Sequence, residues 1–177
     1  LAHCTKLESV ILPDSIKEIR MGAFYDCQNL KNINLPERLE VIRKDAFSNC
    51  KSLTDVKLPN GVEIIEKGTF GECISLENIQ LSNNTTEIEE IAFNNCVSLK
   101  SVYLPDSIKT IGSAAFYNCS SLSTVRMSEG IESVGENVFG GTKAFKNSIA
   151  DEYGSIYFGK VLLYNKGLND TVRVKDS

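Results

Sequence analysis

One short pattern of apolar and polar positions recurs along most of this chain at a fixed interval of 23 residues. In each copy two apolar residues flank a polar one, which is the period of two of a β-strand with one buried face. In the fifth copy Val102 and Leu104 take the buried positions, and Ser101 and Tyr103 take the outward ones. Proline then ends the strand in four of the six copies, because it cannot donate a hydrogen bond to a sheet. An I-x-x-I stretch predicts the return of the chain, and A-F-x-x-C predicts a closing helical turn or tight corner.

Six positions of the repeat keep their residue type in all six copies between Cys4 and Gly141. Three of them are occupied by cysteine (Cys4, Cys27, Cys50, Cys73, Cys96, Cys119), phenylalanine (Phe24, Phe47, Phe70, Phe93, Phe116, Phe139) and leucine (Leu7, Leu30, Leu53, Leu76, Leu99, Leu122). One such unit cannot bury its own apolar face, whereas stacked units bury each other's. The sequence therefore predicts a solenoid of six 23-residue units, with parallel strands stacked about 4.8 Å apart.

The full pattern, C-x-x-L-x-x-V-x-L-P-x-x-I-x-x-I-x-x-x-A-F, resembles the BspA-like, or Treponema-type, leucine-rich repeat. The resemblance covers 138 of 177 residues without an insertion. It implies a right-handed, β-rich solenoid with parallel strands on the concave face and short helical turns or extended segments on the return side. Unit four departs most from the pattern, with Ser82 in place of proline and Thr85 in place of an aliphatic residue.

The chain divides into the solenoid, residues 1–141, and a segment, residues 142–177, that breaks the period. We expect a short helix within residues 142–151, and then strand material over residues 155–164 that forms a hairpin or two strands hinged at Gly159. Residues 172–177 align with residues 102–107, which predicts the start of a further, truncated repeat. The segment is interpreted as an interruption within a longer array, with a terminal cap as the alternative.

Composition narrows the range of functions that this chain could have. With 19 Lys plus Arg against 23 Asp plus Glu, the formal charge of −4 offers no basic field for nucleic acid. No apolar run approaches the roughly 20 residues of a membrane-spanning helix. One histidine and no tryptophan leave few groups able to transfer protons near neutral pH, which argues against an enzyme. We predict no cofactor and no metal, because the chain has no C-x-x-C pair and its histidine, His3, lies at the terminus.

The six cysteines are predicted to be free structural thiols. Equivalent cysteines in neighbouring coils lie about 4.8 Å apart with parallel side chains, whereas a disulfide needs Cβ atoms nearer 3.8 Å that converge. A buried free cysteine behaves as a small apolar residue and suits a repeated slot. His3 and Cys4 are adjacent, and we interpret them as a terminal histidine and a structural thiol rather than as a nucleophilic Cys–His pair. No third group can be named to orient the imidazole.

Two columns of outward strand positions are the candidate binding surface, because their residue types vary while the inward positions barely change. The binding residues we predict are Tyr103, Arg126, Gln80, Lys57, Ser101 and Thr124. Tyrosine and arginine are often energetically important at interfaces, and we expect Tyr103 diagonally one strand from Arg126. A solvated sheet face without a ligand is the alternative.

The resemblance implies a non-enzymatic protein-recognition module of a bacterial surface or secreted protein, with a role in adhesion to host or neighbouring cells. Two alternatives stay open: a structural spacer in a larger surface protein, and an accessory module attached to a hydrolase. The partner is expected to be a protein. We also expect weak self-association or fraying at the N-terminal end, where Leu1, Ala2 and His3 are too few to cover the apolar face of unit one.

Overall fold

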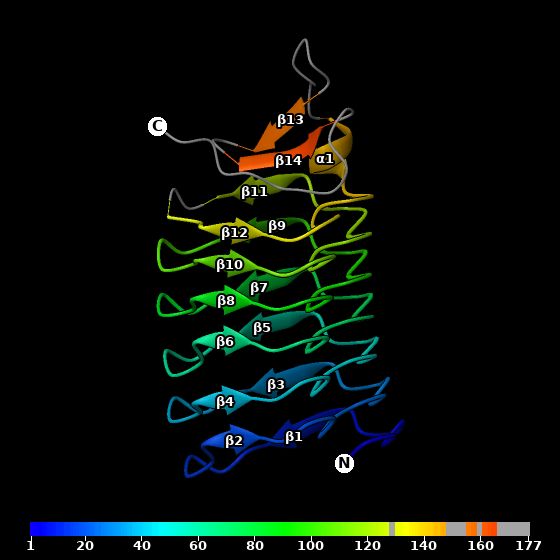
Figure 1. Ribbon diagram of the computed structural model, residues 1–177. Helices are drawn as coiled ribbons and strands as arrows, with labels where there is room; N and C mark the ends of the chain where they lie inside the picture. The colour runs from blue at the N-terminus through cyan, green and yellow to red at the C-terminus, as the bar shows by residue number, and fades with distance from the viewer. Residues whose placement is uncertain (128–129, 148–154, 159–160, 166–177) are drawn as a thin grey trace.

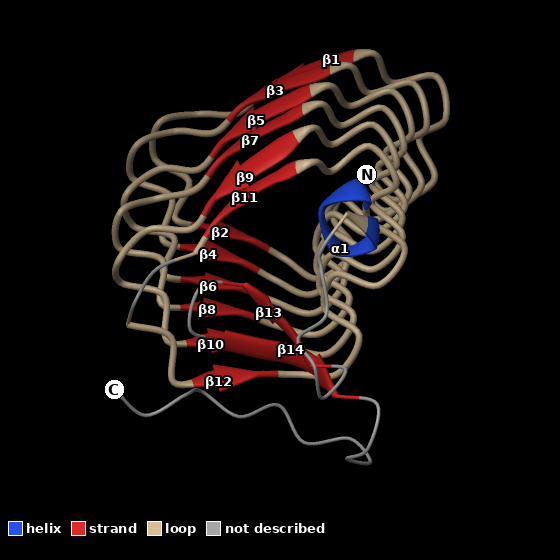
Figure 2. Ribbon diagram, turned by 90° about the horizontal axis from the view of Figure 1, so that it is seen from above, coloured by secondary structure: helices blue, strands red, loops and turns tan. Residues whose placement is uncertain are grey.

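A computed structural model describes residues 1–127, 130–147, 155–158 and 161–165. Figure 1 shows a column of stacked coils, with the N-terminus at one end and a short helix and a hairpin at the other. Seen from above, each coil runs through two strand positions on opposite sides of the column, and loops and turns join them (Figure 2). The predicted parallel-strand solenoid is confirmed.

The first sheet is built from the predicted alternating stretches. Its strands are β1 (Ser9–Ile11), β3 (Asn32–Asn34), β5 (Asp55–Lys57), β7 (Asn78–Gln80), β9 (Ser101–Tyr103) and β11 (Thr124–Arg126). Neighbouring strands are parallel and in register, so that Val10 lies opposite Ile33 and Val56 opposite Ile79. Each central residue points inward and its two neighbours point outward, as the period of two predicts.

The return side of the coil forms a second sheet of very short strands. These are β2 (Glu18–Ile19), β4 (Val41–Ile42), β6 (Ile64–Ile65), β8 (Glu87–Ile88), β10 (Thr110–Ile111) and β12 (Ser133–Val134). They too pair in parallel, with the isoleucines Ile65, Ile88 and Ile111 stacked in register and buried. The I-x-x-I stretch is therefore extended, which is one of the two forms expected for the return side.

The A-F-x-x-C stretch makes a tight corner rather than a helix, because each corner contains residues with left-handed backbone. The residue before the cysteine has a positive φ in each corner, between 58° and 63° at Asp26, Asn49, Glu72, Asn95 and Asn118. Asparagine and aspartate tolerate this conformation better than other residues with side chains. The corner thus reverses the chain within a few residues and holds phenylalanine and cysteine against the core.

The core is one continuous stack between the two sheets. The six phenylalanine rings lie parallel, with centroids 5.1–5.5 Å apart in successive coils. The leucines of the repeat are fully buried in units two to six, at Leu30, Leu53, Leu76, Leu99 and Leu122. Every coil therefore packs on a copy of itself, as stacked repeats do.

Unit four keeps this packing although its sequence departs from the pattern. Ser82 and Thr85 are both buried, and each hydroxyl has a partner in the preceding coil. Thr85 Oγ1 donates to the carbonyl of Val62 at 3.2 Å, and Ser82 Oγ to that of Asn60 at 3.4 Å. The backbone pairing of the strands is less regular than the side-chain packing. The first sheet is interrupted between β7 of unit four and β9 of unit five, and the second sheet between β4 of unit two and β6 of unit three.

The segment after the solenoid contains a helix and a hairpin. The helix α1 (Lys143–Lys146) is shorter than expected and begins after Thr142, whose hydroxyl accepts from the amide of Phe145 at 3.0 Å. Strands β13 (Ser155–Phe158) and β14 (Val161–Asn165) pair antiparallel, as the hairpin prediction required. Figure 1 shows them over the last coil. The truncated repeat predicted for residues 172–177 lies outside the described residues.

Candidate functional site

The outward positions of the first sheet form two columns that follow the stack of coils. One contains Ser9, Asn32, Asp55, Asn78, Ser101 and Thr124, and the other contains Ile11, Asn34, Lys57, Gln80, Tyr103 and Arg126. Of the six predicted site residues, Ser101 is half-buried and the other five are exposed. Because neighbouring strands are in register, the side chains of one column succeed each other at the strand spacing, about 4.8 Å.

The predicted site residues are closer neighbours than the sequence suggested. Tyr103 lies directly opposite Arg126 in the β9–β11 pair, so the expected diagonal arrangement is wrong. Both occupy the third position of their strands, and in-register pairing places equal positions side by side. Ser101 pairs with Thr124 in the same way, and Lys57 with Gln80.

A groove of about 610 Å³ opens on this face where the ladder between β7 and β9 is interrupted. Gln80, Tyr103 and Arg126 line it, above Ile79 of β7 and the leucines that follow β7 and β9, Leu81 and Leu104. Lys57 lies outside the groove and lines, with Gln80, a neighbouring hollow of about 410 Å³. Ser101 and Thr124 line neither of these hollows.

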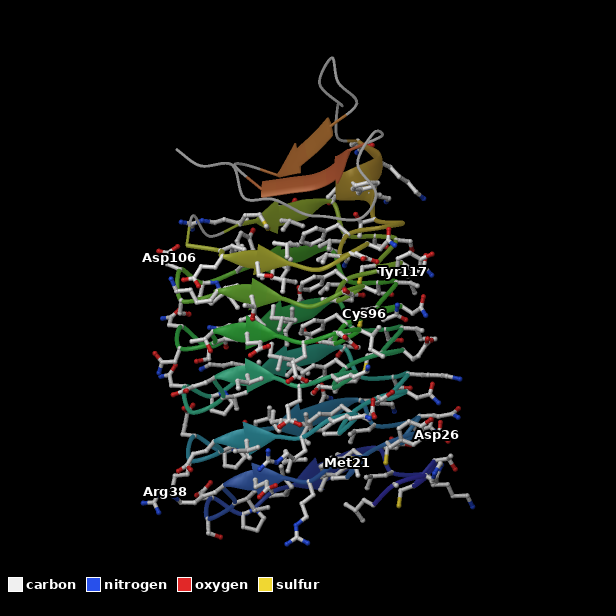
Figure 3. The ribbon with its side chains drawn as sticks, in the orientation of Figure 1. Met21, Asp26, Arg38, Cys96, Asp106 and Tyr117 are labelled. Carbon is white, nitrogen blue, oxygen red and sulfur yellow. The ribbon has the colours of Figure 1, made fainter. Side chains whose placement is uncertain are left out.

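Sequence reasoning missed the rim of the groove. The loop residues after β7 and β9 supply it, namely Asn83, Pro105, Asp106 and Ser107. Figure 3 shows Asp106 at the loop edge of the solenoid, on the side away from the corner that carries Tyr117. The available signal was their place in the repeat, two to four residues after an outward strand residue.

Some cations of the solenoid are held in ion pairs, and others, including those of this face, are not. Along the flanks, ion pairs join residues of successive coils, such as Lys31 with Glu8 at 3.0 Å and Lys100 with Glu77 at 2.5 Å. Within the part of the chain that the structure describes, Lys57 and Arg126 form no such pair. The one acidic residue in the two columns, Asp55, accepts a hydrogen bond from Asn78 at 2.7 Å, which lowers the pKa of its carboxyl.

The sequence model of the BspA type leucine rich repeat region matches residues 1–69 and 40–160, with six copies. The chain belongs to this family. No curated protein matches the chain.

Solved structures of bacterial leucine-rich repeat proteins are similar to this BspA-type chain. One from Bacteroides ovatus is 28% identical over 74% of this chain and 33% of its own length, with a TM-score of 0.66. The leucine-rich repeat protein of T. pallidum is 30% identical over 75% of this chain and 54% of its own, with a TM-score of 0.59. A leucine-rich cell surface protein from Faecalibacterium prausnitzii is 27% identical over 94% of this chain and 44% of its own, with a TM-score of 0.55. The chain thus spans between a third and about half of these proteins.

The cysteines of the BspA-type repeat are all free, as predicted, and five of the six are buried. Each buried thiol from Cys50 onward donates to the carbonyl of the phenylalanine 26 residues earlier, as Cys96 does to Phe70 at 3.1 Å. Cys96 lies inside the corner (Figure 3). Burial raises the pKa of Cys50 to about 12 and that of Cys73 well above its ordinary value, so these thiols stay protonated. They are structural groups rather than nucleophiles.

The terminal histidine also has a structural place. His3 Nδ1 lies 3.3 Å from a carboxylate oxygen of Asp26, and its ring packs edge-on against Tyr25. Among the described residues, no group of three His, Cys, Asp or Glu side chains could hold a metal ion. In the same part of the chain, no helix has the length and apolar character to cross a membrane.

A second large hollow, which the sequence did not predict, lies on the outer face of the second sheet. It measures about 600 Å³, and its lining includes Glu87, Glu89, Glu90 and Lys67. Its floor is low because Gly112 and Gly135 stand where the earlier coils carry Glu66 and Glu89. The carboxylates of Glu66 and Glu89 accept from backbone amides of the preceding coil, so this column serves mainly to tie coils together.

Proposed function

We propose that this chain is a non-enzymatic protein-recognition module that binds its partner through the outer face of the first sheet. The observation that carries the proposal is that Gln80, Tyr103 and Arg126 meet at one groove. Tyr103 is 60% exposed there, although its chain neighbours Val102 and Leu104 are buried core residues. Exposed tyrosine and arginine above an apolar floor are the composition of an interaction site.

The absence of catalysis in this proposal is supported by how the candidate groups are distributed. The hydroxyls of Ser101 and Thr124 lie beside the groove in units five and six, whereas the chain's one histidine, His3, lies at the start of unit one. A Ser–His or Thr–His pair therefore does not form at the groove. The groove's side chains can donate hydrogen bonds, stack and pair with charge, which are binding functions.

The proposal places the protein at the surface of a bacterial cell or outside it, with a role in adhesion. The support is its family, together with the similar protein from Faecalibacterium prausnitzii, which is described as a cell surface protein. A spacer and an accessory module of a hydrolase are the alternatives, and neither would require a ligand on the first sheet.

Partner capture with matched variants tests the proposal. Wild type, Tyr103→Ala/Arg126→Ala and Glu87→Ala/Thr110→Ala are immobilised and exposed to surface proteins extracted from bacterial and mammalian cells. The last variant changes the second sheet and serves as the control. We expect at least one protein to be retained by wild type and control and lost with the groove variant, and to bind wild type directly once it is purified.

The other outcomes are equally decisive. If a ligand were lost only with the second-sheet variant, the binding site would lie on the second sheet instead. If no retained protein binds in a purified pair, the spacer is the better account.

Weak self-association through the N-terminal end is a second part of the proposal. Strands β1 and β2 each pair on one side only, and Leu7, Val10 and Leu12 are half-buried, whereas their equivalents in unit three are buried. Ile19, expected at this open edge, is only 3% exposed and pairs with Ile42. Light scattering over a concentration series should show association that Leu12→Glu abolishes, and hydrogen exchange should be faster in unit one than in unit three. A strictly monomeric protein with equal protection in both units would refute this part.

A further inference from the structure

The second column of the first sheet presents its polar groups in one line. From β5 to β11 it reads Lys57, Gln80, Tyr103 and Arg126, and these are exposed residues of four successive strands. Register pairs join Lys57 with Gln80 and Tyr103 with Arg126, and the groove spans the step between the two pairs. The line therefore consists of a cation, an amide, a phenol ring and a second cation.

Both cations of this line are available to a ligand. Elsewhere on the solenoid, Lys17, Lys31, Lys67, Lys100 and Lys109 are each held by a glutamate of an adjacent coil. Lys57 and Arg126 have no ion-pair partner among the described residues, as is also true of Arg20 and Arg38. Asp55, on the same strand as Lys57, is ionised and accepts a hydrogen bond from Asn78. A line with two free positive charges calls for a partner with negative charges, although the whole chain carries a net charge of −4.

The spacing of the cations fits an extended peptide. Lys57 and Arg126 are three strand steps apart, about 14 Å at the usual strand spacing. In an extended peptide, residues i and i+4 lie about 13 Å apart and point to the same side, with residue i+2 between them. Such a peptide would lie across the strands, along the axis of the solenoid. Since the strand backbones are already paired within the sheet, recognition would depend on side chains.

We propose that the line from Lys57 to Arg126 binds an extended acidic segment of a partner protein, with carboxylates four residues apart and an apolar or aromatic residue midway. One carboxylate pairs with Lys57, the other with Arg126, and the central side chain packs on the exposed ring of Tyr103 over the apolar floor of the groove. This inference rests on the proposed function and adds the chemistry of the ligand.

A peptide titration tests the inference on the complete 177-residue chain. The probe is a nine-residue peptide with glutamates at positions three and seven, phenylalanine at position five and threonine elsewhere. Nuclear magnetic resonance titration should shift resonances of β5, β7, β9 and β11. Arg126→Glu should weaken binding at least about fivefold, because an attraction becomes a repulsion. The matched control is Arg20→Glu, which makes the same charge change at an exposed residue after β2 and should bind as wild type does.

Three further arms sharpen the test. Added salt should weaken binding, since exposed charges are screened. A peptide with lysine in place of the glutamate that meets residue 126 should bind Arg126→Glu more tightly than it binds wild type. A peptide of the same composition with adjacent glutamates should bind several-fold more weakly than the probe.

Several results would overturn the inference. If the probe and the peptide with adjacent glutamates bound equally well, the spacing of the glutamates would not matter. If Arg20→Glu weakened peptide binding as much as Arg126→Glu does, the effect would come from net charge alone. Heparin binding that needs Lys57 and Arg126, without peptide binding, would assign the line to sulfated polysaccharide. Association of the chain with itself through this face would assign it to a second copy. If the peptide fails while partner capture still depends on the groove, the proposed function stands and only this inference falls.

Discussion

The corner of the solenoid and the outward face of the first sheet are both formed by in-register stacking of the coils. Their residue types differ: those of the corner are the same from coil to coil, and those of the outward face vary. At the corner, phenylalanine and cysteine recur unchanged in every coil, whereas on the outward face no residue type fills a column. In an in-register parallel stack, each side chain lies beside its own equivalent about 4.8 Å away. Apolar side chains gain from such a neighbour and repeated like charges repel, so the buried positions can be uniform and a charged outward column cannot. The comparison separates positions that stabilise the stack from positions that are free to bind.

Truncating the phenylalanine stack should have the largest effect. Phe70 has a ring on each side, with both centroids 5.4 Å away, so Phe70→Ala should lower the free energy of unfolding by about 3–5 kcal/mol. Phe139 lies in the last unit of the repeat, where it stacks on Phe116 at 5.5 Å, and Phe139→Ala should cost less. Urea denaturation monitored by circular dichroism measures both. Equal losses would contradict a continuous stack whose end relaxes more easily than its middle.

The cysteine column should make the protein sensitive to alkali. Below about pH 9 the thiols are protonated in both states, and their contribution to stability is fully present. Above that pH, thiols of the unfolded chain ionise while burial keeps Cys50, whose pKa is raised to about 12, protonated in the folded state. The free energy of unfolding should therefore fall as the pH rises from 9 toward 12, by up to about 1.4 kcal/mol per pH unit for each such thiol.

Cys50→Ala isolates this contribution. The variant should be less stable than wild type at pH 7, but its stability should fall less steeply above pH 9. Parallel curves for the two proteins would show that Cys50 does not titrate in this way. In a companion measurement without reductant, the denatured protein should expose six reactive thiols, and fewer would reveal a disulfide.

The outward face should show the smallest effect on stability. Tyr103→Ala removes a ring that is 60% exposed, so the free energy of unfolding should change by no more than about 0.5 kcal/mol. The same variant should lose the captured partner. A destabilisation comparable to that of Phe70→Ala would place Tyr103 with the core residues and remove the distinction between the two regions.

Much of the fold was predictable because the repeat restates the same local signals six times. The alternation around Val102 marks the first sheet, and the isoleucine spacing around Ile111 marks the return strand. The free thiols also followed from geometry, since stacked equivalent residues run parallel. Even the left-handed corner had a signal, because Asp26, Asn49, Asn95 and Asn118 precede cysteines.

The candidate site was only partly predictable, because its shape arises where the repeat is imperfect. The outward columns could be named, but the groove depends on the interrupted ladder between β7 and β9 and on a rim that includes Asn83 and Asp106. The interruption leaves no pattern in the sequence. The slot of Asn83 and Asp106 is polar in every unit, as at Asp14 and Asn60, so it does not single out this groove. The hollow on the second sheet depends in the same way on Gly112 and Gly135, which allow close approach of the preceding coil.

The two interrupted ladders have a mechanical consequence. The first sheet is broken between units four and five, and the second between units two and three, so at each break the other ladder passes through unbroken. The two interruptions lie at different levels of the solenoid. A tensile force along its axis is therefore resisted by at least one unbroken ladder at every level. The corners also join the coils at both levels, since the amide of Phe47 donates to the carbonyl of Thr69 and the amide of Phe93 to that of Ala115. A protein that must transmit force between its ends is better served by the staggered arrangement.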